Sequence, residues 1–220
     1  MHWPAPERPV DHAERSIVSA ILEGQFPPGS ALPAERELSV QVGVTRPTLR
    51  EALRRLERDG WLIVRQGKST VVADFRTDGG LNVLSGIIRH SSGLPPDFVP
   101  NLLQVRLDLA PTYTRLAVER SPDHIVSTLA NHASLDDAPK TFATFDWSLQ
   151  RTLTAVCGNP VYAWILNSFA GFYEHLAQLY FSLPDGRSSS RGYYTVLSET
   201  AQRADGNSAE QATRAVMEES

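Results

Sequence analysis

The side chains in this chain best suited to a recognisable chemistry are arginines and threonines between residues 45 and 58. Arginine recurs at every fourth position, at Arg46, Arg50, Arg54 and Arg58. In a helix this spacing places the guanidinium groups along one side. A guanidinium group can donate two hydrogen bonds to a guanine edge. The pattern therefore favours contact with double-stranded DNA over a solvated helix face in which Glu51 or Glu57 holds Arg50 and Arg54.

Two expected helices meet at a tight corner in front of these arginines. The first helix has Leu38 and Val42 on one apolar face and ends at Gly43, because glycine adopts the left-handed conformation that ends helices at little cost. Thr45 can cap the second helix with its hydroxyl group, and Pro47 is tolerated in its first turn. The buried stripe of the second helix is Leu49, Ala52, Leu53 and Leu56. This arrangement is typical of a helix-turn-helix, whose second helix reads DNA with its N-terminal end.

A β-hairpin is expected directly after this helix. Residues 61–64 and 70–73 are rich in strand-forming residues and are separated by Gln66-Gly67-Lys68, with glycine at the turn. At such a hairpin tip, Lys68 is suited to a phosphate contact and Gln66 to the hydrogen-bond acceptors on the minor-groove floor.

The sequence predicts two domains that are mainly α-helical. Asp11 and Glu14 form a possible capping box for a first helix, whose inner face is Ala13, Ile17, Ala20 and Ile21. A winged helix-turn-helix of three helices and a two-stranded β wing is expected over residues 1–73. The polar residues 74–80 are expected to be a short linker, and residues 81–220 an all-α antiparallel helical bundle.

The helices of the second domain are expected at residues 81–89, 97–119, 122–133, 140–156, 160–182, 187–204 and 208 to the end. Asn159 and Ser208 are the expected caps of two of them. The helix from residue 160 is apolar on most faces, with Val161 and Leu179 on one side and Trp164 on another. We therefore expect it to be buried nearly all round, at the centre of the bundle.

Composition limits the class of protein. The 220 residues suit two domains, and the single cysteine, Cys157, leaves no disulfide within the chain. The sequence lacks both an apolar run of about 18 residues and the apolar core of a secretory signal. We expect a soluble cytoplasmic protein with no membrane contact.

Charge is unevenly distributed along the chain. The net charge of −4 argues against nucleic acid, but residues 36–76 carry nine basic and five acidic side chains, while residues 77–220 carry ten and fifteen. A basic DNA-reading domain is thus joined to an acidic partner domain.

The segment PPGSALPAERELSVQVGVTRPTLREALRRLERDGWL resembles the DNA-binding domain of GntR-type bacterial transcription regulators. The later segments FRTDGGLNVL, NLLQVR, CGNPVYAWILN and GFYEHLAQLYF are similar to the FadR branch of that family, whose members are released from DNA by long-chain acyl-CoA. The resemblance implies a homodimer, held largely through first-domain helices, on a pseudo-palindromic operator. It also implies repression of fatty-acid degradation genes and activation of synthesis genes. The expected DNA contacts are Arg36, Thr45, Arg46, Pro47, Thr48, Arg50, Gln66, Gly67 and Lys68.

Polar side chains also occur within the apolar helices of the second domain. From spacing alone, these are most simply a satisfied core in which Arg106 pairs with Asp108 or Asp146. The FadR resemblance instead implies an acyl-CoA pocket formed by Leu103, Arg106, Tyr173, Tyr180, Tyr194, Met217, Glu219 and Ser220. The sequence departs from the family pattern at Gln66, which replaces a histidine, and at Met217 and Glu218, which replace a glycine and a histidine.

Two other classes of function were weighed. Related regulators sense a carboxylate with a metal held by an aspartate and a histidine four residues later, but here Asp146 is followed by Gln150, a poor metal ligand. The six histidines show no ligand spacing, so no metal or cofactor is expected. The sequence has no nucleophile elbow, phosphate-binding glycine loop or zinc-protease motif, and Asp136 and Asp137 are more typical of a solvated loop, so no enzyme is expected.

Overall fold

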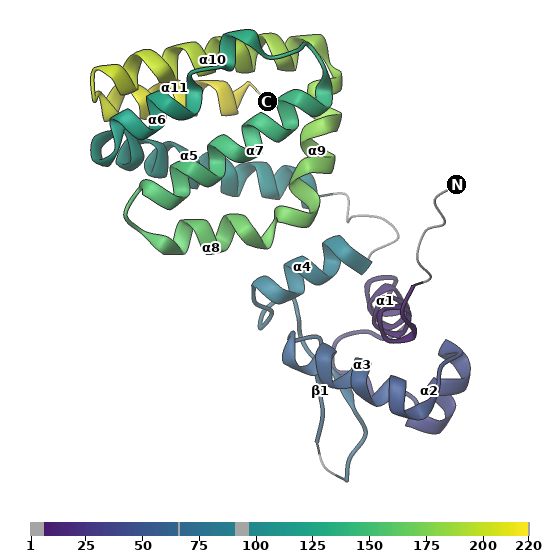
Figure 1. Ribbon diagram of the computed structural model, residues 1–220. Helices are drawn as coiled ribbons and strands as arrows, with labels where there is room; N and C mark the ends of the chain where they lie inside the picture. The colour runs from purple at the N-terminus through teal and green to yellow at the C-terminus, as the bar shows by residue number, and fades with distance from the viewer. Residues whose placement is uncertain (1–6, 66, 91–96, 220) are drawn as a thin grey trace. The chain divides into compact units, whose positions relative to one another are not determined.

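The computed structural model describes residues 7–65, 67–90 and 97–219. The chain divides into two compact units, Met1–Leu94 and Pro95–Ser220. The first unit contains a small sheet, and the second consists of helices (Figure 1). In the described part of the chain, none of the helices combines the length and the apolar character needed to cross a bilayer.

The first unit is a winged helix-turn-helix, as the sequence predicts. Its helices are α1 (Pro9–Leu22), α2 (Glu35–Val42), α3 (Arg46–Arg58) and α4 (Leu81–His90), and its strands are β1 (Leu62–Ile63) and β2 (Val71–Val72). The strands pair antiparallel, with Leu62 opposite Val72, and the hairpin between them forms the wing (Figure 1). The N–H of Leu32 donates to the carbonyl of Thr70 at 2.8 Å, so the segment before α2 supports the wing from its other edge.

The core of the first unit is formed by one face of α3, by α1 and by Trp61. The stripe expected on α3 is buried at all four positions, Leu49, Ala52, Leu53 and Leu56. Trp61 is 1% exposed, and its ring lies 5.0 Å from that of Phe75. A Cβ atom on Gly86 of α4 would lie 2.7 Å from Trp61 Nε1, so α4 approaches the indole with bare backbone. Trp61 therefore joins the base of the wing to α4.

The segment expected to be a linker is packed with the first unit. Phe75 is buried, and the N–H of Thr77 donates to the carbonyl of Asp74 at 3.1 Å in a turn. Val83 of α4 is 5% exposed within the same core, so the compact division falls after α4 and differs from the expected boundary at residues 74–80. Residues 74–80 are mostly polar, which suggested a linker. Phe75 before the Asp-Gly-Gly run and Val83 after it are apolar, and both pack in the core of the first unit.

The capping box expected at Asp11 is absent. The helix α1 begins earlier, at Pro9, and has no side-chain cap. Glu14 is instead buried and accepts from Arg55 Nη1 of α3 at 3.2 Å, while Asp11 lies 3.5 Å from the same nitrogen. A partner 41 residues away thus takes the carboxylate that local spacing assigned to the helix end.

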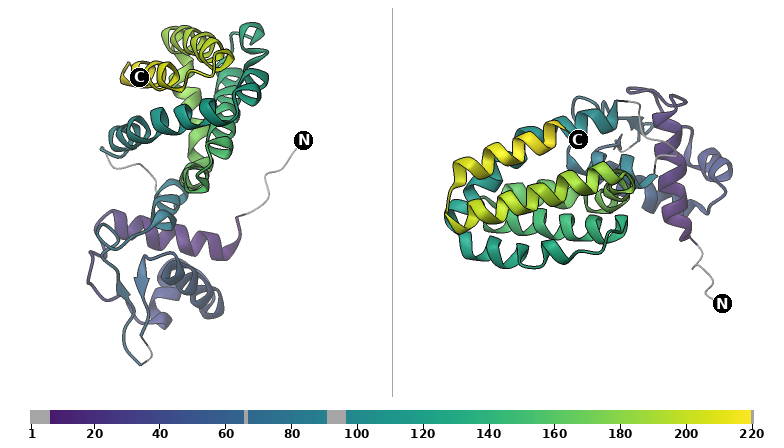
Figure 2. Two further views of the ribbon diagram at one scale, coloured as in Figure 1. Left: turned by 90° about the vertical axis from the view of Figure 1, so that its left-hand side faces the viewer. Right: turned by 90° about the horizontal axis from the view of Figure 1, so that it is seen from above.

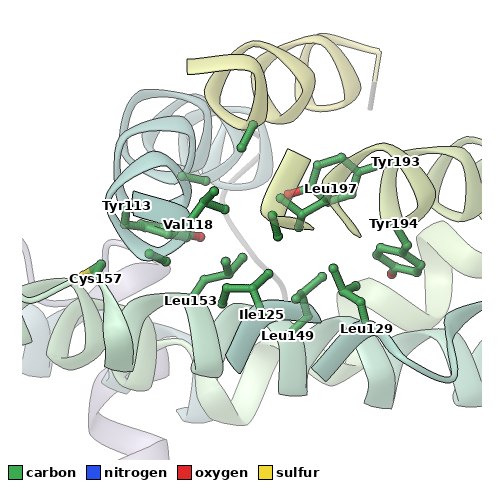
Figure 3. Close-up of a cluster of buried hydrophobic side chains, with 14 of the residues drawn as sticks. Tyr113, Val118, Ile125, Leu129, Leu149, Leu153, Cys157, Tyr193, Tyr194 and Leu197 are labelled. Carbon is green, nitrogen blue, oxygen red and sulfur yellow. The ribbon is translucent and has the colours of Figure 1, made fainter. Parts of the chain in front are cut away.

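The second unit is an all-α bundle. Its elements are α5 (Phe98–Arg120), α6 (Pro122–Leu129), a 3₁₀ helix (His132–Ser134), α7 (Pro139–Val156), α8 (Pro160–Ser168), α9 (Ala170–Ser182), α10 (Pro184–Gln202) and α11 (Gly206–Glu218). The helices α10 and α11 run side by side, and α11 packs along α5 (Figure 2). Pro111 lies inside α5. Buried side chains from α5, α6, α7 and α10, including Tyr113, Leu129, Leu153 and Leu197, meet in the interior (Figure 3).

The expectation of one buried central helix over residues 160–182 is wrong. The chain forms two helices there, α8 and α9, separated at Phe169. Trp164 is 62% exposed, Val161 46% and Leu179 56%, whereas α7 supplies fully buried side chains to the core. Apolar side chains of α8 and α9 line a cavity, and other apolar side chains of both helices are exposed to solvent.

The two caps expected in this unit have different outcomes. Asn159 Oδ1 accepts from the N–H of Val161 at 3.1 Å, which confirms that cap. The last helix begins at Gly206, and the N–H of Ser208 donates to Asp205 Oδ1 at 3.0 Å, so Asp205 and not Ser208 is the cap.

The pH dependence of stability should report the buried Glu14. Burial raises the pKa of Glu14 above its ordinary value of 4.5, although the nearby Arg55 charge opposes the shift. A carboxyl group whose pKa is raised on folding stabilises the folded state below its unfolded pKa, and this contribution is lost as the pH rises through its folded pKa. We therefore expect the stability of Glu14→Gln relative to the original protein to increase as the pH rises from 4.5. Urea denaturation of both proteins at a series of pH values from 4.5 upward measures this difference in stability. A difference that stays constant or falls as the pH rises would contradict the raised pKa of Glu14.

Candidate functional site

The N-terminal end of α3 is fixed by local hydrogen bonds. Gly43 ends α2 with a φ of 75°, which a side chain would disfavour. Thr45 Oγ1 accepts from the N–H of Thr48 at 3.4 Å, and the two threonine hydroxyl groups lie 2.9 Å apart. Both expectations for this corner are confirmed. The start of α3 is thereby presented at the surface, with Thr45, Arg46 and Pro47 exposed.

The basic side chains near this corner differ in what holds them. Arg36, Arg46 and Arg54 are exposed, and among the described residues they make no ion pair. Arg50 Nε donates to Glu35 Oε2 at 2.7 Å. Glu51 and Glu57, the acids expected to neutralise this face, contact other groups.

Those two acids stabilise the domain itself. Glu51 pairs with Arg55, and Glu57 Oε1 accepts from the backbone N–H of Val64 at 3.3 Å, which ties the base of the wing to α3. The row of Arg46, Arg50 and Arg54 is therefore not neutralised by acidic residues of its own helix.

The wing has the turn that its sequence predicts. Gly67 has a φ of 72°, and the N–H of Lys68 donates to the carbonyl of Arg65 at 3.0 Å. Lys68 is exposed. Gln66, the expected minor-groove contact, lies outside the described residues. The wing projects beyond α3 in the same domain (Figure 1).

The second unit contains a cavity of about 330 Å³ lined mainly by apolar side chains. They come from α5, α8, α9 and α11 and from Phe169 between α8 and α9, and they include Leu103, Leu109, Ile165, Leu176 and Met217. Such a cavity, apolar with a few polar groups, is the usual form of a small-molecule site.

The polar part of the cavity is organised by one carboxylate. Asp146 of α7 is 5% exposed and accepts hydrogen bonds from the hydroxyl group of Tyr173 at Oδ2 and from that of Tyr194 at Oδ1, the latter at 3.1 Å. Arg106 Nη2 lies 3.7 Å from the same Oδ2. Arg106 is therefore paired with Asp146, while Asp108 accepts from Gln104 at 3.0 Å.

Burial dominates the ionisation of this cluster. It raises the pKa of both Tyr173 and Tyr194, and the neighbouring Asp146 charge adds to each rise. Burial alone would lower the pKa of Arg106, but its electrostatic interactions with Tyr173 and Asp146 more than offset this and hold its pKa above the ordinary value. The cluster therefore keeps a charged guanidinium group at the cavity wall with neutral phenols beside it.

Most of the residues expected to bind acyl-CoA surround this cavity. Leu103, Arg106, Tyr173, Tyr180 and Met217 line it. Tyr194 is fully buried and lies outside the lining, but it contacts two lining residues, Asp146 through a hydrogen bond and Tyr193 through its ring. Glu219 is not among the lining residues, and its Oε2 accepts from Ser189 Oγ at 3.4 Å. Ser220 lies outside the described residues.

Sequence reasoning missed three further tyrosines in the lining, Tyr113, Tyr162 and Tyr193. Tyr113 follows Arg106 by seven residues on α5, which places both on one helix face, so helical spacing was a usable signal. Tyr162 and Tyr193 come from other helices, and their positions depend on how the bundle packs.

The two residues weighed for a metal are hydrogen-bonded to tyrosines. Asp146 accepts from two tyrosine hydroxyl groups, and Gln150 Oε1 accepts from the Tyr113 hydroxyl group at 2.6 Å. The part of the chain that the structure describes has no group of three or more His, Cys, Asp or Glu residues placed to hold a metal ion.

Comparison with known proteins accounts for both units. The family model of bacterial regulatory proteins of the gntR family matches residues 9–72, and that of the FadR C-terminal domain matches residues 73–220. This chain belongs to the GntR family. Its second domain belongs to the FadR type. The chain is therefore a transcription regulator and not an enzyme, and the resemblance seen in its sequence is confirmed.

Similar proteins extend over most of this GntR regulator. A fatty acid metabolism regulator protein from Shewanella halifaxensis is 45% identical over 88% of this chain and 81% of its own length. The corresponding protein from Edwardsiella ictaluri is 42% identical over 89% and 82%. The solved structure of Lar, which controls the expression of the Listeria monocytogenes agr system, covers 98% of this chain and 96% of its own with a TM-score of 0.61. At 13% identity, the likeness to Lar shows the fold alone.

The buried tyrosines should make the stability of this regulator sensitive to alkaline pH. Burial raises the pKa of Tyr193 to about 12 and raises those of Tyr113, Tyr173 and Tyr194 as well. Because the folded state holds these protons more tightly, its stability should fall as the pH rises above 10, the ordinary tyrosine value.

An ultraviolet titration measures this ionisation directly. We expect these four phenols to remain protonated above pH 10 and to ionise together with loss of the near-ultraviolet circular dichroism signal. The control is the same titration in concentrated guanidinium chloride. Gradual ionisation of all six tyrosines while the circular dichroism signal persists would contradict the burial of the cluster.

Proposed function

We propose that this GntR regulator controls fatty acid metabolism as a cytoplasmic homodimer that binds a pseudo-palindromic operator and is released from it by long-chain acyl-CoA. On DNA it represses degradation genes and activates synthesis genes. The relatives named fatty acid metabolism regulator protein support the pathway. The observation that carries the proposal is the apolar cavity organised by Asp146 and Arg106, in the same chain as an exposed arginine row at the start of α3.

DNA contact is assigned to α3 and the wing. Arg46 and Arg50 read base edges in the major groove, because both are exposed on the first turns of α3. The supporting contacts to phosphate and sugar are Arg36, Thr45, Pro47, Thr48, Gly67 and Lys68. Gln66 contacts the minor groove. A single module of this size covers little DNA, so a two-fold dimer on a two-fold site supplies the remaining affinity.

Base reading and phosphate contact should separate in mutants. Arg46→Ala should cost about 1–3 kcal/mol on operator DNA and much less on random DNA, because the lost hydrogen bonds are to base edges. Lys68→Ala should weaken both kinds of DNA alike and reduce the salt slope by about 1. Fluorescence anisotropy titrations at several salt concentrations measure both. Equal losses on operator and random DNA for Arg46→Ala would remove its base-reading role.

The effector assignment rests on the cavity chemistry. A long acyl chain needs an apolar wall, which Leu103, Ile165 and Leu176 provide. The thioester oxygen needs a donor, and the Arg106 guanidinium group is within the lining, whereas the Tyr173 hydroxyl group beside it already donates to Asp146. Glu219 and Ser220, after the end of α11, are assigned to the CoA portion. No metal is required by this assignment.

Release from DNA requires only that acyl-CoA prefer a form of the dimer whose recognition helices are wrongly spaced. Couplings of about 1–3 kcal/mol are typical of such switches. The helix α4 is suited to take part, because Gly86 lies directly against Trp61 at the base of the wing. By thermodynamic reciprocity, operator DNA must weaken acyl-CoA binding by the same factor.

Calorimetry with a C18 acyl-CoA tests cavity and coupling together. We expect binding to weaken when operator is present, and Leu103→Asp to weaken binding at least about tenfold because it places a charge on the apolar wall. Val196→Asp on α10 is the matched control, since Val196 is comparably exposed but is not part of the lining. Unchanged affinity with and without operator would contradict the release mechanism. Stoichiometric metal at Asp146 would favour a carboxylate sensor instead.

A further inference from the structure

Glu35 holds the side chain of Arg50 across the helix-turn-helix corner. Glu35 is the first residue of α2, and its Oε2 lies 2.7 Å from Nε of Arg50 on α3. The side chains are 38% and 55% exposed. An ion pair this exposed adds little to stability, because solvent screens it and ordering both side chains costs entropy. A contribution to folding stability therefore does not explain why Glu35 is placed beside Arg50.

The atoms used by the pair decide which atoms remain for DNA. Glu35 occupies the Nε edge of the guanidinium group, and no other hydrogen bond from Arg50 is found within the described residues. The two terminal nitrogens, Nη1 and Nη2, stay available. A guanine presents two acceptors, O6 and N7, which such a pair of parallel N–H groups can bind. Glu35 therefore leaves Arg50 only the end-on approach to a base.

Arg46 and Arg54 lack this restraint. They form no ion pair with any described residue, so they can contact bases or phosphates in several orientations. A carboxylate at this surface also repels the phosphate backbone, which lowers affinity for all DNA. Glu35 thus opposes non-specific binding while it orders one base-reading side chain.

We propose that Glu35 is a positioning residue that sets the DNA specificity of this regulator by holding Arg50 in the end-on orientation. This inference rests on the proposed function, because it assumes that Arg50 reads a base. An acidic residue that makes no attractive contact with DNA would thereby help the regulator to discriminate between its operator and other sequences.

The matched control is Glu37, which is in the same first turn of α2 and is exposed. Glu37 Oε1 accepts from Gln41 Nε2 at 3.4 Å and does not contact Arg50. Glu35→Ala and Glu37→Ala remove the same charge and acceptor from the same helix end. Only the first removes the partner of Arg50, so a general charge effect on DNA affinity should appear in both.

The experiment compares operator and random-DNA affinities for the full chain carrying Glu35→Ala, Glu37→Ala, Arg50→Ala, or Arg50→Ala with Glu35→Ala. We expect Glu35→Ala to lower the ratio of operator to random-DNA affinity about tenfold, by loss of an ordered bidentate contact, while random-DNA affinity rises. Glu37→Ala should leave the ratio unchanged. The double mutant should have the ratio of Arg50→Ala alone, because Glu35 acts through Arg50.

Three outcomes would overturn the inference. If Glu35→Ala keeps the ratio while Arg50→Ala lowers it, Glu35 does not position Arg50, and the proposed DNA reading stands. If Glu35→Ala lowers the ratio equally in the absence of Arg50, Glu35 acts on DNA directly. If Arg50→Ala itself leaves the ratio unchanged, both the inference and the base-reading role of Arg50 fail. Thermal melting of each mutant excludes unfolding as the cause.

Discussion

The burial of one face of α3 is the constraint on which the DNA-binding domain depends. Leu49, Leu53 and Leu56 are each at most 5% exposed, and burial of a leucine contributes about 1.5–3 kcal/mol. The exposed ion pairs of the same helix contribute about 0–1 kcal/mol each. Packing therefore fixes how α3 is rotated, and the arginines face outward because the opposite face is occupied. The electrostatics of this domain refine an orientation that the apolar stripe has already set.

The second domain solves the opposite problem, since it keeps polar groups inside an apolar bundle. Asp146 is tolerated there because tyrosine hydroxyl groups satisfy both of its oxygens and Arg106 lies near one of them. Three helices, α7, α9 and α10, are connected through this single carboxylate. Arg106 is 3.7 Å from Asp146, and its side chain remains 30% exposed, so it is the least constrained member of the cluster. A ligand oxygen can reach it without displacing a tyrosine.

The sequence was most informative where structure is decided by near neighbours. Gly43, Thr45 and Asn159 end or begin helices through contacts with residues at most five positions away, and each was identified from its local pattern. Local patterns are misleading where a distant partner competes, as when Arg55 binds Glu14, the residue expected in the helix cap. The pattern over residues 160–182 was also misleading, because an apolar sequence does not distinguish a core helix from a cavity wall. The cavity is lined by side chains from α5, α7, α8, α9, α10 and α11, and the family resemblance, not helical spacing, pointed to Tyr173 and Tyr180.

The close approach of Gly86 to Trp61 has a consequence for how proteins of this kind exchange their parts. The family model of the FadR C-terminal domain matches from residue 73, so its match includes α4, although α4 packs within the DNA-binding unit. A recombination event at residue 73 would bring a foreign α4 onto the same indole, and any side chain larger than hydrogen at position 86 would collide with it. A second domain joined to this DNA-binding domain at residue 73 therefore needs a first helix whose face fits against Trp61.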